Sequence, residues 1–426
     1  MNRGTSLLRQ AVDFRPSEVR ALWLGFAFHF LILAGYYILR PIRDSIAASN
    51  RLETLPWMFT ATLIAMLLAN VLFAAVVARM SRRKFIPLAY GFFIFNLTLF
   101  FVLMRSAPST EQVWIGRALY VWVSVFNLFN TAIFWAFMTD LFTVEQGKRL
   151  YGFIAVGGSL GAIAGAYITK HFIGQIGPAN LLGISAVIFA IGASLVRFFP
   201  SGFADRRQPN DAKEAPIGGS IWSGLTHIAR SPYLLGLAGT MLLYTITSTW
   251  AYFQQSDLAR ATLKTSEERT VFLANLEIWV NSITVLVQIF FTGRLLKWFG
   301  VGVTLVAMPF VSMLGFAGMG IAPSLALLGV FQVVRRAAAY ALLRPSREIL
   351  FTVLPREDKY KVKSVTDTLG YRTGDQIGAW SYGALHALGL GLSSISFVAV
   401  PIVVGWCGLS VWLGRKQAAL AKASER

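Results

Sequence analysis

The sequence predicts an all-α membrane protein with twelve transmembrane helices in two halves of six. Hydrophobic residues make up 55% of the 426 residues and charged residues only 14%, and the mean hydropathy is +0.59. Apolar runs of bilayer-spanning length, about 20 residues, recur along the chain, and a polar segment near the middle separates them into two groups. These observations predict an integral membrane protein.

The first half is expected to cover residues 19–199, after a basic cytoplasmic segment at 1–18. Its first apolar run is not a cleavable signal, because it is too long and lacks a small-residue cleavage site. The predicted helices run from Val19 to Leu39, Leu55 to Ala78, Phe85 to Met104, Val113 to Phe142, Tyr151 to Phe172 and Ala179 to Phe199.

The second half is expected to cover residues 231–414 and to be followed by a short cytoplasmic tail at 415–426. A polar linker, 200–230, precedes it, and the stretch from Pro200 to Ser220 is rich in Pro, Gly, Asp and Arg, as linkers commonly are. The predicted helices run from Tyr233 to Gln254, Val271 to Leu296, Gly300 to Ile321, Ala326 to Val353, Val365 to Leu388 and Leu392 to Leu413.

The distribution of basic residues predicts the orientation in the membrane. The formal net charge is +19, but Lys and Arg occur in short clusters between apolar runs, which argues against a nucleic-acid-binding domain. One set of alternate loops holds most of them, including Arg79 to Lys84 and Arg356 to Lys361. Since positive charge stays inside, we expect both termini in the cytoplasm and the protein in the inner or plasma membrane.

An internal repeat supports two six-helix halves. The segment Leu141 to Val144 recurs as Leu350 to Val353, and the same offset of 209 residues relates Tyr151 to Tyr360. Two parallel six-helix repeats are the plan of major-facilitator transporters, which rock about a site at the membrane midplane. The predicted fold is therefore major facilitator-like.

The strongest candidate site lies in the tenth predicted helix. Three arginines and a tyrosine would fall within an arc of about 80° at 100° per residue; they are Arg336, Tyr340, Arg344 and Arg347. An ionisable group in hydrocarbon costs on the order of 2.5 to 3.5 kcal/mol, so this face is expected to line a cavity or to meet partner charges. Because the arginine fork matches phosphate or carboxylate, we expect it to bind an anion.

The eleventh predicted helix adds Lys363 and Asp367, which are four residues apart and within ion-pair range. We assign Lys363 to the anion site, with a gate latch formed by this pair as the alternative. Glu348, Asp367 and Asp375 are candidates for gating or coupling. Since Arg347 and Glu348 are adjacent and face different directions, each is expected to need its own partner.

The end of the first helix carries a second candidate site. Arg40 and Arg43 are three residues apart and share a face, and Pro41 is expected to kink or end the helix. Both arginines lie on the predicted outer side, where positive charge is disfavoured. We therefore assign them to substrate binding and Asp44 to gating, with snorkelling to the interface as the alternative.

The fourth, seventh and eighth predicted helices hold the remaining candidates. Asn127 is expected to line the cavity or, equally, to join helices by hydrogen bonds, and Asp140 to belong to a cytoplasmic gate. Glu277 is a candidate counter-charge for an arginine of the tenth helix. An aromatic cluster on the seventh helix is expected either to stack a planar ring or to form an interfacial belt. It contains Trp250, Tyr252 and Phe253, and Gln254 follows it.

Catalytic and metal-binding patterns are absent from the sequence. The four histidines are scattered and no Ser/His/Asp set or metal-ligand spacing occurs. The single cysteine, Cys407, has no partner for a disulfide. We therefore expect neither an enzyme nor a cofactor.

These motifs resemble those of the nucleotide transporter family, the ATP/ADP translocases of plastids and intracellular bacteria. Leu39 to Asp44 is similar to the family's Leu-Arg-Asp-Thr-Lys-Asp, and Phe134 to Tyr151 resembles its Phe-Trp … Thr-Thr-Val-Asp-Glu-Ala-Lys-Arg-Phe-Tyr. Tyr340 to Glu348 and Lys359 to Asp367 are similar to Tyr-Ser-Leu-Phe-Asp-Pro-Thr-Lys-Glu and Lys-x-Lys-x-Lys-Ala-Ala-Ile-Asp.

The resemblance implies a major-facilitator fold and transport of nucleotides or related phosphorylated compounds, with no resident cofactor. Two glutamates of the family fall near Val123 and Tyr252, which are uncharged here. Our first hypothesis is an exchanger of ATP and ADP or of another phosphorylated anion, with the lipid bilayer and this solute as partners and no nucleic acid. A proton-coupled exporter of amphiphilic compounds and a non-transporting scaffold or receptor are the alternatives.

Overall fold

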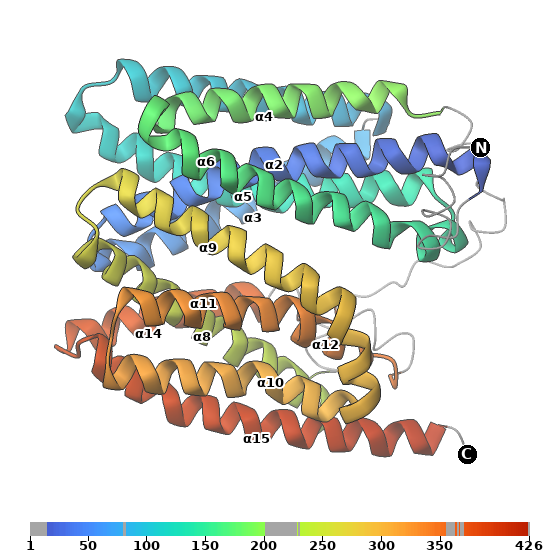
Figure 1. The fold of residues 1–426 in the computed structure, drawn as a ribbon, viewed down its shortest axis with the longest axis vertical. Helices are drawn as coiled ribbons and strands as arrows, with labels where there is room; N and C mark the ends of the chain where they lie inside the picture. Colours follow the sequence, from blue (N-terminus) through green and yellow to red (C-terminus); the bar gives the residue numbers. More distant parts are fainter. Residues whose placement is uncertain are drawn as a thin grey trace. The chain divides into compact units, whose positions relative to one another are not determined.

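The computed structural model describes residues 15–79, 82–200, 228, 231–354, 363, 366 and 370–424. Every regular element in these ranges is a helix (Figure 1), which confirms the predicted all-α class. The candidate residue Asp367 and almost all of the predicted linker at 200–230 lie outside the described residues.

Contacts within the chain divide it into two compact units. Unit 1 comprises Met1–Ala47, Ala61–Lys213 and Thr265–Asn281, and unit 2 comprises Ala48–Thr60, Glu214–Lys264 and Ser282–Arg426. Each unit therefore includes one short segment from the other half of the sequence. The segment Thr265–Asn281 matters most below, because it brings Glu277 into unit 1.

Long apolar helices make up most of unit 1. They are α2 (Val19–Ser49), α3 (Leu55–Arg79), α4 (Arg82–Ser106), α5 (Ser109–Leu141) and α6 (Val144–Leu195). Aromatic side chains from several of them form one buried core. The ring of Phe28, for example, lies 5.7 Å from that of Tyr90 and 5.5 Å from that of Phe134, within the usual range for aromatic pairs.

The longest helical segment, α6, folds back on itself at Gly177. The φ angle of Gly177 is 75°, a left-handed conformation that favours glycine. Both arms of α6 contact the same part of α2: a Cβ added to Gly165 would collide with the carbonyl oxygen of Ala34, and the Ser185 hydroxyl donates to the Gly35 carbonyl at 2.9 Å. On a straight helix, residues 20 apart would be separated by about 30 Å.

Helices of varied length and two π-helical turns make up most of unit 2. They are α8 (Pro232–Thr262), the end of α9 (Ser266–Val287), the π-helical turn η6 (Gln288–Thr292), α10 (Gly293–Ile321), α11 (Leu325–Ala338), the π-helical turn η7 (Ala339–Leu343), α12 (Arg344–Leu350), α14 (Tyr371–Ala387) and α15 (Leu392–Ser424). Gly300, with φ of 73°, interrupts α10. Residues before and after Gly300 contact the helical stretch 335–340. Gln288 donates to the Tyr340 carbonyl, and Ser312 accepts from Arg335.

Nine helical segments in the described part of the chain are long and apolar enough to cross a membrane. Two of them, Arg149–Phe198 and Ser266–Ile321, contain 50 and 56 residues, whereas one crossing needs about 20. Gly177 and Gly300 divide these two segments. Each of these two segments is thus long enough for two crossings, and the predicted number of twelve helices stays a prediction.

Candidate functional site

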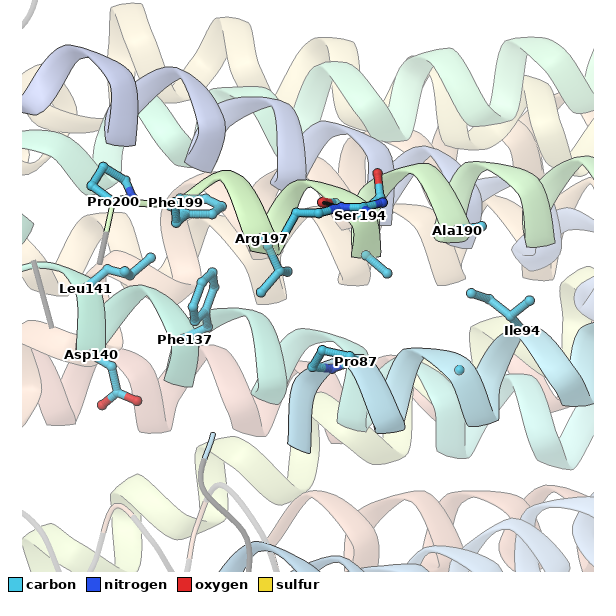
Figure 2. Close-up of a pocket in the computed structure, with 13 residues that line it drawn as sticks. Pro87, Ile94, Phe137, Asp140, Leu141, Ala190, Ser194, Arg197, Phe199 and Pro200 are labelled. Atoms are coloured by element: carbon cyan, nitrogen blue, oxygen red, sulfur yellow. Dashed lines mark hydrogen bonds between the residues drawn. The ribbon is translucent and has the colours of Figure 1, made fainter. Parts of the chain in front are cut away.

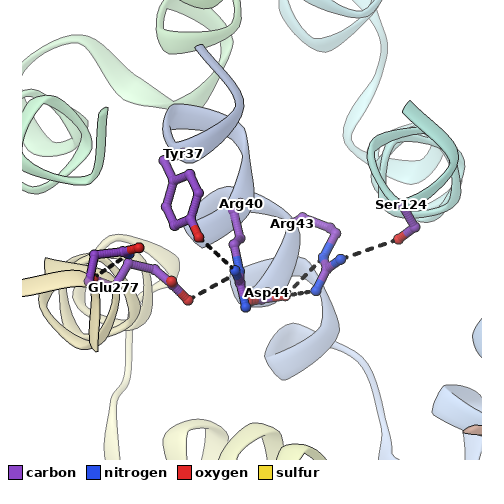
Figure 3. A network of polar contacts seen from close by, with 7 residues as sticks. Tyr37, Arg40, Arg43, Asp44, Ser124 and Glu277 are labelled. Atoms are coloured by element: carbon purple, nitrogen blue, oxygen red, sulfur yellow. Dashed lines mark hydrogen bonds and ion pairs between the residues drawn. The ribbon is translucent and has the colours of Figure 1, made fainter. Parts of the chain in front are cut away.

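Arg40 on α2 forms an ion pair inside unit 1. Its Nε atom lies 3.1 Å from Oε1 of Glu277, and its Nη1 atom donates to the hydroxyl of Tyr37 at 3.3 Å (Figure 3). The side chain of Glu277 is only 3% exposed and that of Arg40 is 17% exposed. Glu277 thus pairs with an arginine of the first helix, and its pairing with an arginine of the tenth helix stays a prediction.

Arg43 lies one helical turn further along α2. Its Nε atom donates to Oδ1 of Asp44 at 2.9 Å, and its Nη1 atom donates to the Ser124 hydroxyl of α5 at 3.4 Å (Figure 3). The guanidinium also lies over the ring of Tyr120, 5.3 Å from its centroid. Pro41 lies inside α2 without ending it, since the helix continues to Ser49.

Both arginines of α2 are therefore neutralised by carboxylates with little exposed surface. This arrangement differs from snorkelling, in which the charged group reaches the membrane interface. Removing one partner from such a pair leaves an uncompensated charge and is strongly destabilising. The pairs can therefore hold unit 1 together.

A π-helical turn changes the predicted arginine face in unit 2. α11 ends at Ala338, and the π-helical turn η7 precedes α12. A π-helix has wider turns than an α-helix, so the spacing of 100° per residue does not hold across it. Arg336 is half-buried, whereas Arg344 is exposed and lies 4.6 Å from the centroid of the Tyr340 ring. The prediction of one continuous face from Arg336 to Arg347 assumed an unbroken α-helix and is corrected here.

The charges at the end of this segment form a small ion-pair cluster. Arg347 Nη2 lies 3.3 Å from Oε1 of Glu348, so these adjacent residues do pair, contrary to the expectation that each needs its own partner. Lys363 pairs with the other carboxylate oxygen of Glu348. The predicted partner of Lys363, Asp367, lies outside the residues that the structure describes.

Arg335, which the sequence reasoning passed over, is the most deeply buried arginine among the described residues of unit 2. It is 3% exposed, and its Nη2 atom donates to Ser248 at 2.8 Å and to Thr247 at 3.3 Å. Its Nε atom donates to Ser312 at 3.3 Å. A signal for it exists in the sequence, because Arg335 continues the buried positions 328, 331 and 332 of α11 at the spacing of one helix face.

The aromatic candidates on α8 are mainly parts of the core of unit 2. Trp250 and Phe253 are 3% and 0% exposed; the Trp250 indole donates to the Ser381 hydroxyl at 3.0 Å. Gln254 donates to Ser396 at 2.8 Å. Only Tyr252 among the three aromatic residues keeps substantial exposed surface, so it is the one that a planar ring can reach.

The remaining candidates are dispersed. Asn127 is half-buried on α5. Asp375 of α14 lies 3.3 Å from Arg372 and accepts a hydrogen bond from Thr249 at 3.4 Å. Asp140 lines a cavity of about 710 Å³ enclosed by α4, α5 and the end of α6 in unit 1.

This cavity is mainly apolar (Figure 2). Its wall includes Ile94, Phe137 and Phe199, with Asp140 and Arg197 as charged members. Of the residues assigned to the site from sequence, Asp140 alone belongs to the described lining. The cavity and the arginine clusters are thus separate features.

The profile of the Major Facilitator Superfamily matches residues 22–347. Among characterised relatives, the chain is 21% identical over 306 residues to ADP,ATP carrier protein 1 of Chlamydia pneumoniae, covering 62% of this chain and 59% of that protein. It is also 21% identical to the chloroplastic ADP,ATP carrier protein 1 of Arabidopsis thaliana, covering 90% of this chain and 71% of the relative. The chain thus spans less than two thirds of the Chlamydia protein.

Solved structures share this fold at low sequence identity. A mutant of the nucleoside transporter NupG gives a TM-score of 0.61 with 13% identity, covering 94% of this chain and 98% of that chain. A bacterial homologue of the human lysosomal transporter Spinster gives a TM-score of 0.56 with 14% identity, covering 96% and 95%. These likenesses concern the fold alone.

Proposed function

Because this chain belongs to the Major Facilitator Superfamily, we propose that it is an alternating-access exchanger of nucleotides, such as ATP and ADP, or of another phosphorylated organic anion. We place it in the inner or plasma membrane with both termini in the cytoplasm, as the distribution of basic residues favours. It acts as a carrier and catalyses no covalent step.

The observation that carries this proposal is the set of buried and partly buried arginines within membrane-spanning helices of both units. Arg40, Arg43 and Arg335 occupy positions where an ionisable side chain is expensive and usually functional. A guanidinium matches phosphate oxygens bidentately. The relatives named ADP,ATP carriers add support for a phosphorylated solute.

In this proposal the arginines of α2 and of the α11–α12 segment bind phosphate groups, and Tyr252 contacts the organic ring. Carboxylates paired with these arginines compete with the solute, so their release accompanies binding. Glu277 and Asp44 serve this role in unit 1, and Glu348 serves it for Arg347 and Lys363 in unit 2.

The test is uptake of labelled ATP into proteoliposomes with or without internal ADP. We expect uptake only when ADP is inside, with competition by other nucleotides. Uptake that follows a pH gradient and ignores internal ADP would instead support the proton-coupled exporter. Absence of uptake of all phosphorylated solutes by folded, reconstituted protein would contradict the proposal.

A further inference from the structure

Arg335 lies close to the middle of the membrane-spanning part of unit 2. It is near the centre of the span Leu325–Leu350, and one of its partners, Thr247, is midway between the ends of α8 (Pro232–Thr262). Another hydroxyl partner of Arg335, Ser312, is near the centre of the arm of α10 that follows Gly300. Sites in transporters of this architecture lie near the midplane, so the depth of Arg335 suits solute binding.

The three hydroxyls around Arg335 hold the guanidinium but have no proton left for a ligand. Thr247, Ser248 and Ser312 each donate their own proton to a backbone carbonyl of the preceding turn. A hydroxyl has one proton and two lone pairs, so the lone pairs remain for Nε and Nη2 of Arg335. The arrangement fixes the plane of the guanidinium.

No carboxylate within the described residues reaches Arg335. Its hydrogen bonds engage Nε and Nη2, and no group among the described residues accepts a hydrogen bond from Nη1. Arginine cannot lose its proton in a protein, and a buried charge without a partner is strongly unfavourable. The guanidinium therefore keeps both a full charge and an unused pair of N–H donors.

Tyr244 lies beside Arg335, and two further aromatic side chains lie beside Tyr244. The Tyr244 ring centroid lies 6.0 Å from the guanidinium carbon, and the rings of Tyr371 and Trp406 lie 5.9 and 6.4 Å from that of Tyr244. Trp406 is fully buried, and its Nε1 donor has no partner among the described residues. Tyr244 and Tyr371 are only half-buried, so part of each side chain stays accessible.

We infer that Arg335, with Tyr244, Tyr371 and Trp406, forms a midplane subsite for one anionic group, a phosphate or a carboxylate, of the transported solute. The surroundings offer donors and a positive charge without a competing carboxylate in the described residues. The bound anion supplies the missing counter-charge and accepts from Nη1. This inference rests on the proposed function, because it names the part of unit 2 that binds the exchanged anion.

The experiment measures thermal unfolding of the purified full-length protein with ATP, ADP, AMP, inorganic phosphate or sulfate, and with chloride as the reference salt. The variants are Arg335→Gln, Arg335→Lys and Tyr244→Phe. Arg415→Gln, on the exposed surface of α15, is the control with the same change in charge. A ligand that binds only the folded state raises the unfolding midpoint in proportion to its affinity.

We expect the anion that stabilises the wild type to lose at least tenfold in affinity in Arg335→Gln, less in Arg335→Lys and Tyr244→Phe, and nothing in Arg415→Gln. The unfolding midpoint of Arg335→Gln without anion should equal or exceed that of the wild type, because an uncompensated charge is removed. Undiminished anion affinity in Arg335→Gln or Arg335→Lys would overturn the inference.

Two further outcomes separate this inference from the proposed function. Stabilisation by phosphate or sulfate but by no nucleotide, abolished in Arg335→Gln, would uphold the subsite and reject nucleotide exchange. Stabilisation by ATP that is equal in the wild type and in every Arg335 variant would uphold nucleotide binding and reject the subsite. If no anion stabilised the wild type, both would be contradicted.

Discussion

The partly buried arginines of unit 1 and the buried Arg335 of unit 2 lie in similar apolar helices but have different partners. Arg40 and Arg43 face carboxylates at hydrogen-bonding distance, whereas Arg335 is surrounded by hydroxyls and aromatic rings. An arginine that is paired with a carboxylate stabilises the fold of its unit in the absence of a ligand. An arginine without a carboxylate partner is ready for an anion from outside the protein.

The difference has opposite consequences for stability. Removing a carboxylate from unit 1 leaves a buried cation, which costs about 3 to 5 kcal/mol in fully buried pairs. Removing the charge of Arg335 removes the unfavourable burial of that charge, although three hydrogen bonds to neutral hydroxyls are also lost. Variants of the two regions should therefore separate the stabilising charges from the ligand-binding charge.

The largest loss of stability is expected for Glu277→Gln. The carboxylate is 3% exposed and lies 3.1 Å from Arg40, so the variant leaves the guanidinium without its counter-charge. We expect the free energy of unfolding to fall by about 3 kcal/mol, measured by denaturant titration in mixed micelles. The double variant Arg40→Gln/Glu277→Gln should recover part of this loss, because neither charge then remains. Equal stability of Glu277→Gln and wild type would remove the basis of the comparison.

A smaller loss is expected for Asp44→Asn. Arg43 keeps its hydrogen bond to Ser124 and its contact with the Tyr120 ring, so its charge is only partly uncompensated. We expect a fall of about 2 kcal/mol in the free energy of unfolding. Glu53→Gln is the control, since Glu53 is exposed and the same titration should change by less than about 0.5 kcal/mol. An effect of Asp44→Asn as small as the control's would mean that Ser124 suffices for Arg43.

Ser248→Ala tests the neutral shell around Arg335. The Ser248 hydroxyl accepts the shortest hydrogen bond of the guanidinium, 2.8 Å, and a hydrogen bond to a charged group contributes about 1.5 to 3 kcal/mol. Because Thr247 still accepts from the same nitrogen, we expect a fall of about 1.5 kcal/mol. Ser106→Ala, at an exposed position, is the matched control. A loss as large as that of Glu277→Gln would show that the hydroxyls replace a carboxylate in full.

The fold was largely predictable from the sequence, because hydrophobic runs and bilayer thickness determine most helices. Of the two glycines that interrupt helical segments, Gly177 falls between two predicted spans and Gly300 at the start of another. The sequence could not predict that the segment carrying Glu277 joins unit 1. That grouping depends on long-range packing, which local periodicity does not contain.

The candidate site was predictable in residue type but less so in position. Arg40 and Arg43 were found by their shared face. The choice of Arg336 over Arg335 depended on an unbroken α-helical spacing through residues 339–343, where the structure has a π-helical turn. The burial pattern that precedes this turn, at positions 328, 331 and 332, extends to Arg335 and was the more reliable guide.

The smallest change in stability is expected for Arg344→Gln, which tests whether exposed arginines of unit 2 act on the solute. Arg344 is exposed and lies over the ring of Tyr340, an interaction of about 0.5 to 1 kcal/mol at exposed sites. We therefore expect the free energy of unfolding to fall by no more than about 1 kcal/mol, while the KM for exchanged ATP rises severalfold. Unchanged KM with a clear loss of stability would assign Arg344 to the structure of α12 and leave the buried arginines as the anion ligands. A raised KM at unchanged stability would extend the ligand-binding class from Arg335 along the segment to α12.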